Sequence, residues 1–476
     1  MAACVRWKAI LKHDESLGDS LIILKTEKKM RTIHKKTLVA GLKTACLGML
    51  LAVASVSASD QIPAGPQKKP IVLVGGTIHT MAGATIENGM ILFDKGKIVA
   101  VGEKIEIPAD AQRVDISGKH VYPGMIESAS ILGLTEINST SATRDFSELG
   151  EINPNVKAAV AINPDSEHFP VTRANGVAMA VSMPRGGVIA GQAALLQLDG
   201  WTWEDMTLKS PVGMVVNWPR MTVITAWWMT QSPEEQRKRS KKNVEKLHKA
   251  MEKARAYKIA REAAGKKGVP FHKYDSRWEA MLPVLRGEVP VWVVADEVKQ
   301  ILAAIEWAER ENLKMVLVGG ADAWRVTDLL KERDIPVIVT PVLRTPSRRD
   351  EAFDTPFTLP QKLHEAGVRF AISGGSSFGN ERNLPYHAAK AASYGLPVDE
   401  ALKAITLYPA MIAGVADRVG TLEPGKDATL FVSDGNPLEV MTHVSLLYLQ
   451  GRKVDLNNKH KTLYHKYKTK YEQLAQ

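Results

Sequence analysis

Residues 121–134, VYPGMIESASILGL, are the stretch of this chain that is most informative about its fold and its site. The stretch has the pattern of a half-buried strand that leaves a Pro-Gly corner. Side chains at positions i and i+2 of a strand point to the same side, so a metal centre built on this strand would carry two histidines at alternate positions. Those two positions hold Ala129 and Ile131, and neither side chain can bind a metal. The strand therefore predicts a buried site that lacks its first pair of metal ligands.

The N-terminal region has the composition of a signal peptide. Residues 30–36 are basic, residues 38–56 are mostly apolar, and small residues at 56–58 suit a cleavage site. Lys43 interrupts the apolar run and leaves its clean part too short for a comfortable membrane span. We expect a leader over residues 1–58 that starts at Met30, export to the periplasm, and no stable membrane span after cleavage. An uncleaved anchor is the alternative.

Charge and cysteine content exclude several classes of protein. Cys4 and Cys46 both precede the proposed cleavage point, so the mature chain would have no disulfide and no cysteine-metal site. Residues 1–58 hold 10 Lys/Arg and 4 Asp/Glu, a net charge of +6, which leaves +4 of the total +10 for the remaining residues. So mild a charge argues against nucleic acid as a partner.

The rest of the chain changes its pattern twice. Residues 59–70 are rich in proline and indicate a linker, and residues 71–122 contain short strands separated by turn residues. Residues 123–415 alternate strands with helices, which favours parallel strands joined by helical crossovers. Short strands return at 416–456, before a tail at 457–476. We predict an α/β fold: a (β/α)8 TIM-like barrel over 123–415, with a small β-sandwich domain formed by the two chain ends.

A basic helical insertion is expected at residues 232–267. Ser232, Pro233 and Glu235 form the pattern of a capping box with proline at the first helical position. The helix that follows is rich in Lys and Arg, but Glu245 and Glu252 interrupt the basic run. A solvated helix face is the preferred interpretation. Nucleic-acid contact is less favoured, and attachment of residues 237–267 to a lipid surface ranks last.

Three segments together resemble the amidohydrolase superfamily, and within it the imidazolonepropionase-like branch. They are IVLVGGTIHTM with GKIVAVG and GKHVYPGMIES, then GVIAGQAALLQLDGWTWEDM (187–206), and then residues 382–439, which include LPYHAAKAASYGLPVDEALKAITLYPAMIAG and GTLEPGKDATLFVSDGNPLE. The resemblance covers residues 71–456. It implies a hydrolase that acts on non-peptide carbon–nitrogen bonds through water activated by one or two divalent metals.

The same resemblance implies where the metal ligands belong, and none of those positions holds a donor side chain. They fall on Ala129 and Ile131 in strand one, near Val294 in strand five, near Gly319 in strand six, and on Gly374 or Gly375 in strand eight. Asp296 and Asp322 lie within a slip of one or two residues in this alignment. We therefore expect no cofactor, and a divalent metal such as zinc only if the site is rearranged.

Other residues offer weak replacements. The histidines after Ala58 are never closer than five residues, so no HxH or HxxxH pair is present. His387 follows the strand-eight loop, where packing against the next helix is the preferred role. Donors at residues 165–168 have the pattern of a helix start. Ser373 precedes Gly374 and Gly375 in a loop at the expected barrel mouth, without the surroundings of a nucleophile.

Polar residues gather after the predicted strands, where this architecture places function. Several are arginines, which suit an anionic or carboxylate-bearing ligand through paired hydrogen bonds, although paired structural charges are an equal alternative. The candidates for binding a small molecule are Arg144, Asp145, Asn153, Arg185, Gln192, Arg344, Arg382, Asn383 and His387.

Two hypotheses from different classes remain open. In the first, the chain is a hydrolase that uses a rearranged site. In the second, which ligand counting favours, it is a metal-free relative that binds a small ligand or a partner without turnover. Metal content of the purified chain separates the two.

Overall fold

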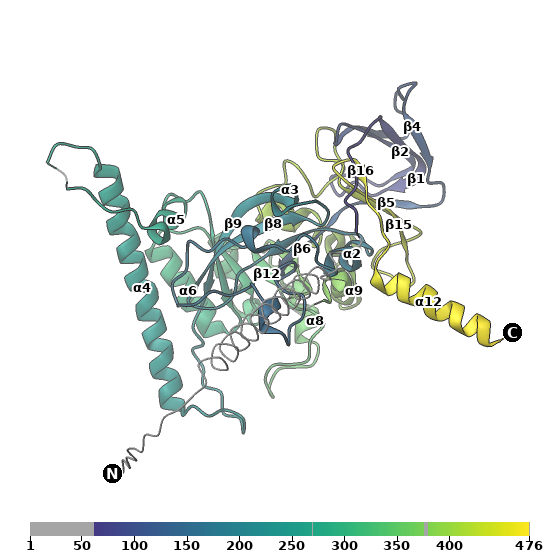
Figure 1. Cartoon of the computed structure of the whole chain (residues 1–476). Helices are drawn as coiled ribbons and strands as arrows, with labels where there is room; N and C mark the ends of the chain where they lie inside the picture. The colour runs from purple at the N-terminus through teal and green to yellow at the C-terminus, as the bar shows by residue number, and fades with distance from the viewer. Residues whose placement is uncertain (1–60, 269, 376–378, 476) are drawn as a thin grey trace, which may run out of the picture. The chain divides into compact units, whose positions relative to one another are not determined.

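The computed structural model describes residues 61–268, 270–375 and 379–475, so the leader predicted over 1–58 lies outside the described residues. Two eight-stranded sheets organise this part of the chain (Figure 1). Residues 61–70 join no strand or helix. Among the described residues, no helix combines the length and apolar character that a membrane crossing requires.

The first sheet is the predicted eight-stranded barrel, and its strands follow one another in space in chain order. They are β6 (Met125–Ser130), β7 (Val177–Ser182), β8 (Ile189–Gln197), β9 (Thr207–Asn217), β10 (Val291–Ala295), β11 (Met315–Gly319), β12 (Val337–Val339) and β13 (Phe370–Ile372).

The direction of β8 differs from the expectation of parallel strands throughout. β8 runs antiparallel to both β7 and β9, while the other neighbouring pairs are parallel. The reason lies in the connection, because residues 183–188 between β7 and β8 are too few for a helical crossover, which needs a dozen residues or more. The barrel is thus an eight-stranded α/β barrel with one reversed strand.

Burial of β6 also differs from the expected half-buried pattern. All six residues of β6 are buried. One face of a barrel strand fills the interior and the other packs under the surrounding helices, so strands in such barrels are covered on both sides. Residues on both faces of β6 are therefore buried, including Glu127 and Ser128.

Helices occupy the connections and surround the barrel (Figure 1). α6 shows why they pack there, since Ile301, Ala304, Ile305 and Ala308 repeat at helical spacing and are buried. The α-helices are α2 (His168–Arg173), α3 (Trp203–Met206), α4 (Pro233–Ala263), α5 (Ser276–Leu285), α6 (Val298–Arg310), α7 (Thr327–Glu332), α8 (Thr355–Glu365), α9 (Leu384–Ser393), α10 (Val398–Lys403), α11 (Leu407–Ile412) and α12 (Lys459–Leu474). The 3-10 helices are η1 (Ser141–Thr143), η2 (Ala159–Ala161), η3 (Ala323–Arg325) and η4 (Glu381–Asn383).

The insertion at 232–267 contains α4, which begins with the expected capping box. The Ser232 hydroxyl accepts from the Glu235 backbone N–H at 3.2 Å, and the Glu235 carboxylate accepts from the Ser232 N–H at 2.7 Å. Its apolar residues, including Leu247 and Met251, are buried on one side, and α5 packs on this helix. Most basic residues of α4 remain exposed to solvent.

The second sheet is built from both ends of the chain, as we predicted for the small domain. It forks at β1, whose first half pairs with β4 and whose end pairs with β5. This lets one continuous sheet enclose its own core, which includes Leu73, Phe93 and Leu430. Its strands are β1 (Ile71–Ile78), β2 (Ile86–Asp94), β3 (Lys97–Gly102), β4 (Gln112–Asp115), β5 (His120–Pro123), β14 (Leu430–Ser433), β15 (Val444–Leu449) and β16 (Arg452–Lys453).

A buried ionic network joins the barrel to this second sheet. Asp199, which follows β8, accepts from Arg173 of α2 and from Arg452 of β16, each at 3.0 Å. The backbone N–H of Ala64 donates to the same carboxylate at 3.0 Å. Both chain ends are thus held against the barrel through one acidic side chain.

Candidate functional site

The barrel mouth is defined by how the first and last strands meet. β6 and β13 stand at opposite ends of the strand order and share no backbone ladder in the described structure. Residues 404–405 bridge them, because Ile126 donates its N–H to the Ile405 carbonyl at 2.8 Å and Ile372 donates to the Ala404 carbonyl at 2.9 Å. Above these two bonds the strands are joined through a side chain instead.

Glu127 makes that upper junction. The Gly374 N–H donates to Glu127 Oε2 at 2.9 Å, and the Ala129 N–H lies 3.2 Å from Oε1. Ser373 Oγ forms a short hydrogen bond with the same Oε1. Glu127 and Ser373 have no exposed surface. A carboxyl group therefore takes the place of a ladder between β6 and β13, and we call Glu127, Ser373 and Gly374 the seam.

Burial raises the pKa of Glu127 to about 8, although the hydrogen bonds from Ser373, Gly374 and Ala129 oppose the shift. The carboxyl is consequently mostly protonated at neutral pH. In that state its O–H can donate to Ser373 Oγ, while the Ser373 hydroxyl donates to the Ala129 carbonyl at 3.2 Å. Each polar group of the seam then has a partner without a buried charge.

His387 of α9 packs beside the seam. Its Nδ1 accepts from the Leu343 N–H at 3.1 Å, so the proton of the neutral ring is assigned to Nε2. Burial lowers the pKa of His387 to about 4. A Cβ at Gly374 would stand 3.1 Å from Glu127 Oε2 and 3.6 Å from His387 Nε2, so glycine leaves these groups their space. This arrangement agrees with the packing role preferred for His387.

The positions that the family uses for metal do not fit one here. Ala129 and Val294 line a partly open cavity of about 100 Å³. A Cβ on Gly319 would lie 2.5 Å from Asp296 Oδ1, and one on Gly375 would lie 2.6 Å from Thr340 Oγ1, so neither backbone position can accept a ligating side chain without rearrangement. Ile131 is buried. Across the described ranges, His, Cys, Asp and Glu residues form no group of three or more suited to a metal ion.

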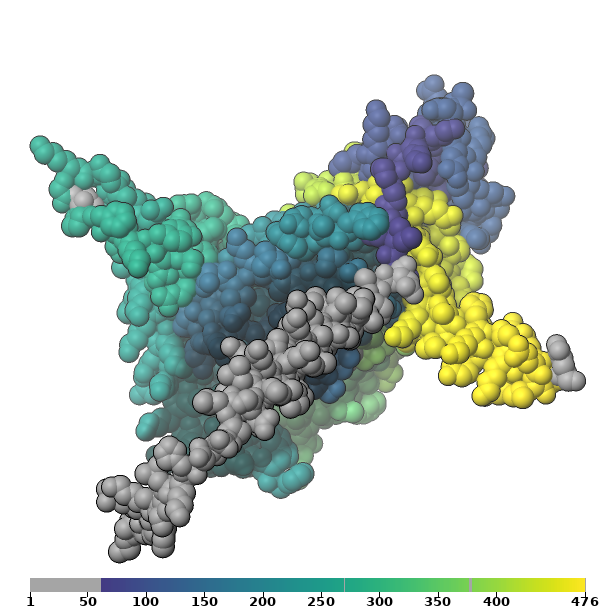
Figure 2. Space-filling view, viewed as in Figure 1, coloured from purple at the N-terminus to yellow at the C-terminus, as the bar shows by residue number. Residues whose placement is uncertain are grey.

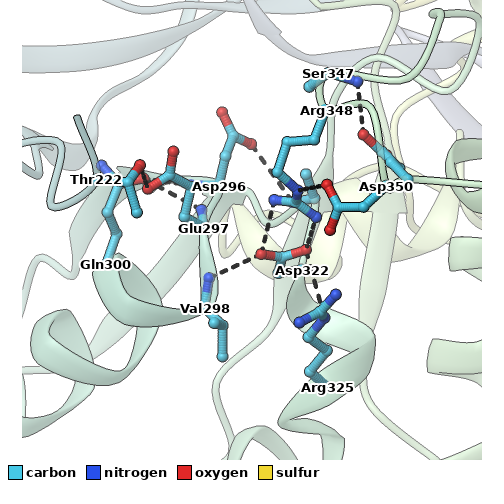
Figure 3. Close-up of polar contacts among 12 residues, drawn as sticks. Thr222, Asp296, Glu297, Val298, Gln300, Asp322, Arg325, Ser347, Arg348 and Asp350 are labelled. Atoms are coloured by element: carbon cyan, nitrogen blue, oxygen red, sulfur yellow. Dashed lines mark hydrogen bonds and ion pairs between the residues drawn. The ribbon is translucent and has the colours of Figure 1, made fainter. Parts of the chain in front are cut away.

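The two aspartates near the alignment positions have separate surroundings. Asp322 is buried and accepts two hydrogen bonds from the Arg348 guanidinium, at 2.6 and 3.0 Å, and one from the Val298 N–H at 3.1 Å. It therefore ties the start of α6 to the loop after β12. Figure 3 shows the Asp296 carboxyl turned away from Asp322. Asp296 is exposed at the mouth, so the carboxyl groups of Asp296 and Asp322 do not converge on one metal site.

Among the residues predicted to bind a ligand, Arg185 lines the cavity. Its guanidinium lies 5.9 Å from the centre of the Phe146 ring. Desolvation lowers the pKa of Arg185, and the charge of Glu381 opposes the shift. The full lining consists of Ala129, Ser130, Met183, Pro184, Arg185, Val215, Val294, Val318 and Thr340.

Two of the other arginines are directed to partners elsewhere. Arg344 forms an ion pair with Glu351 at 2.7 Å, and Arg382 contacts His460 Nδ1 at 3.0 Å. Arg144 is exposed on the loop after β6. The ion pair of Arg344 matches the alternative of paired structural charges at loop bases, whereas Arg382 contacts an imidazole nitrogen.

The remaining candidates take part in local structure. Asn153 donates to the Gly150 carbonyl at 3.2 Å, and buried Gln192 donates to the Pro154 carbonyl at 3.0 Å. Asp145 is exposed, and Asn383 precedes the first residue of α9. Arg185 and His387 are thus the predicted residues nearest to the cavity and the seam, and the other seven are dispersed.

The two buried glutamates of this region were not predicted from the sequence. Glu127 was visible as an acidic residue inside a strand, but its partners lie about 250 residues away in the chain. Glu381 of η4 is buried, and one of its carboxyl oxygens lacks a partner within the described residues. Burial raises the pKa of Glu381, while the nearby charges of His168 and Arg185 oppose the shift.

Comparison with known proteins connects this geometry to a family. The model of the amidohydrolase family matches residues 357–460. The amidohydrolase tasK of Hapsidospora irregularis is 23% identical over 390 residues, which is 76% of this chain but 39% of that protein. This chain therefore spans well under half the length of that curated relative. A 62-residue stretch is 39% identical to part of a 5-methylthioadenosine/S-adenosylhomocysteine deaminase from Symbiobacterium thermophilum, covering 12% of this chain and 14% of that protein.

Solved structures extend the likeness over the whole barrel. An amidohydrolase from Thermotoga maritima superposes with a TM-score of 0.73 at 28% identity, covering 81% of this chain and 99% of that one. A prolidase bound to N-methylphosphonate-L-proline has a TM-score of 0.50 at 18% identity, covering 81% of this chain and 100% of that one, which shows a shared fold. By its fold, its motifs and these matches, the chain is similar to proteins of the amidohydrolase superfamily.

Proposed function

We propose that this chain is a non-catalytic member of the superfamily, on its imidazolonepropionase-like branch, that binds a small anionic molecule at the barrel mouth. The supporting observation is the replacement of metal ligands by cavity lining: Ala129 and Val294 stand where donors belong, and the space before them is mostly apolar. Without an activated water, the usual attack on a carbon–nitrogen bond has no source of hydroxide.

The size and lining of the cavity limit the ligand. An apolar cavity of roughly 150 Å³ holds benzene, which has six non-hydrogen atoms, so the space of about 100 Å³ here suits a body of about four non-hydrogen atoms. The Arg185 guanidinium has the forked N–H geometry that matches a carboxylate. Thr340 and Ser130 add hydroxyl groups to the lining. A short-chain carboxylate fits these features.

Hydrolysis at a rearranged site is the second candidate. The names of the relatives favour it, since one is an amidohydrolase and another a deaminase. It would require a nucleophile or metal that the seam does not offer, because the Glu127 and Ser373 side chains are fully buried and hydrogen-bonded to each other. A zinc ion would need donors brought together from the loops around the mouth.

Metal content separates the two functions. The purified mature chain is incubated with zinc, manganese or iron(II), dialysed, and measured by elemental analysis. We expect far less than one equivalent of any of these ions. About one tightly held ion per chain would contradict the proposal and favour hydrolysis.

Ligand binding is tested with straight-chain carboxylates of increasing length, using calorimetry. We expect an optimum chain length, loss of binding in Ala129→Leu because the cavity is filled, and about tenfold weaker binding in Arg185→Gln because the charge-assisted bond is lost. Arg349→Gln is the matched control, since Arg349 is exposed on a neighbouring loop. Equal losses in both arginine variants, or no binding at any length, would refute a carboxylate site at the cavity.

A further inference from the structure

The C-terminal helix α12 stands apart from the family fold. It begins after Asn458, a buried residue whose side chain accepts from the Lys461 N–H at 3.1 Å. All side chains of α12 are exposed. Figures 1 and 2 show the helix (yellow) running clear of the other described elements. The family match ends at residue 460, so nearly all of α12 lies beyond it.

One face of α12 is apolar and aromatic although nothing in the described structure covers it. Five large side chains lie on it with exposed fractions between 41% and 71%. Their spacing of one, three, four and three residues keeps them within about a third of the helix circumference, given 3.6 residues per turn. These residues, which we call the aromatic stripe, are Leu463, Tyr464, Tyr467, Tyr471 and Leu474.

Lysines border the aromatic stripe on both sides. With about 100° between successive residues, one set of lysines falls along one edge of the stripe and a second set along the other. Glu472 falls beside the edge that carries Lys468, whose Nζ lies 3.9 Å from its carboxylate. The helix carries five lysines against this one acidic residue, a net charge of +4. The lysines are Lys459, Lys466 and Lys470 on the first edge, and Lys461 and Lys468 on the second.

We propose that α12 lies flat on an anionic lipid bilayer, with the aromatic stripe in the headgroup region. Tyrosine suits this interface because its ring is apolar and its hydroxyl stays hydrated. Lysines at the edges of the stripe can extend their stems along the apolar surface and reach lipid phosphates. Charge complementarity therefore selects an anionic surface, and α12 lies on it without crossing.

A second copy of the chain fits α12 less well. Residues that flank an apolar stripe face their counterparts when two helices pair. On α12 these flanking positions are lysines on both edges, so pairing would place like charges together around a short apolar strip. A lipid surface removes that repulsion and supplies counter-charges.

The basic helix α4 offers no such stripe. Leu247, Met251 and Tyr257 are buried, so the exposed part of α4 is mostly charged. Its basic residues are also mixed with glutamates, among them Glu245 and Glu252. Of the two basic helices, α12 is therefore the one whose exposed surface combines charge with apolar side chains.

The test is flotation of the full chain with vesicles of phosphatidylglycerol and phosphatidylcholine, compared with vesicles of phosphatidylcholine alone. We expect binding to the anionic vesicles that weakens as salt rises. Tyr467→Ser with Tyr471→Ser should weaken binding about tenfold through lost apolar contact, and Lys466→Gln with Lys470→Gln by a similar factor. Circular dichroism and thermal unfolding establish that the variants remain folded.

Two controls match these changes. Thr462→Ser with Thr469→Ser alters the polar face of α12, and Lys241→Gln with Lys242→Gln removes the same charge from α4. Both should bind like the unaltered chain. The proposal is overturned if anionic vesicles do not float the chain, or if the α4 variant loses as much binding as the α12 variant. It also fails if the tyrosine variant binds normally, which indicates adsorption by charge alone, or if sedimentation shows a dimer that the tyrosine change dissociates.

Discussion

Two buried carboxyl groups each join separate parts of this molecule, and they are stabilised in opposite ways. Asp199 lies between two guanidinium groups, from Arg173 and Arg452, each 3.0 Å from a carboxylate oxygen. Glu127 has no cation beside it among the described residues and is held by a hydroxyl and by backbone N–H groups. The first group is neutralised by paired charges and the second by a proton.

The Asp199 network, which we call the joint between the barrel and the second sheet, is therefore insensitive to moderate changes of pH. The seam at the barrel mouth responds to them. The arginines around Asp199 stay charged at any ordinary pH, so the attraction between barrel and second sheet persists. The proton on Glu127 is lost as pH rises through about 8, which would place a bare charge in the seam. pH therefore acts where β6 meets β13.

The largest expected effect is at the joint. Asp199→Ala leaves the buried Arg173 and the half-buried Arg452 without the carboxylate that lies between them, and breaking such a network costs about 3–5 kcal/mol of unfolding free energy. Urea denaturation measures it. Asp110→Ala is the control, because Asp110 is exposed and should change stability little. A loss below about 1 kcal/mol for the Asp199 variant would show that the ionic network contributes little to the joint.

The next effect concerns the pH dependence of the seam. The folded pKa of Glu127, about 8, exceeds its ordinary value of 4.5, so its stabilising contribution is complete below 4.5 and is lost as pH rises toward 8. The slope is about 1.4 kcal/mol per pH unit. His387 has the opposite sign, with stability lost as pH falls from 6.5 to about 4, so pH 6.5–8 separates Glu127 from His387.

Glu127→Gln tests this slope. The amide can donate to Ser373 Oγ and accept from the Gly374 N–H, as the protonated acid does, but it cannot ionise. The difference in unfolding free energy between the two chains should change by about 2 kcal/mol from pH 6.5 to pH 8, in favour of the variant at the higher pH. Glu103→Gln, at an exposed site, should parallel the unaltered chain. Parallel curves for Glu127→Gln as well would mean that the seam carboxyl is not protonated.

Much of the fold could be predicted because its signals are local. The Pro123-Gly124 corner, the alternation of strands and helices, and the capping box of Ser232 each depend on a few neighbouring residues. The reversed direction of β8 was missed because strand pattern does not encode direction. Residues 457–476 were expected to form only a tail, although the spacing of Tyr464, Tyr467 and Tyr471 already indicated a helix face.

The candidate site was less predictable because its contacts join distant parts of the chain. The family motifs located the five positions where metal ligands are expected. The residue identities alone show that none of these positions has a donor side chain. They could not show that Arg348 pairs with Asp322, or that Arg382 turns to His460. Nor could they place Ser373 against Glu127. Such pairings depend on which loops meet at the mouth, which no local pattern contains.

The smallest expected effect concerns the Ser373 hydroxyl of the seam. Ser373→Ala removes the hydroxyl that bonds Glu127 and that also accepts from the Gly375 N–H at 3.0 Å. A loss of about 1–2 kcal/mol is expected near pH 6.5, because buried polar groups lose a partner. The hydrogen bond from Ser373 lowers the pKa of Glu127, so its removal should move the loss of stability to higher pH. Ser130→Ala is the matched control: Ser130 is a buried serine on β6 that bonds the Val181 carbonyl at 3.1 Å, so it should lose stability without moving the pH profile. If both serine variants keep the original pH profile, the hydroxyl of Ser373 does not set the ionisation of Glu127, and the proton would have to be held by burial alone.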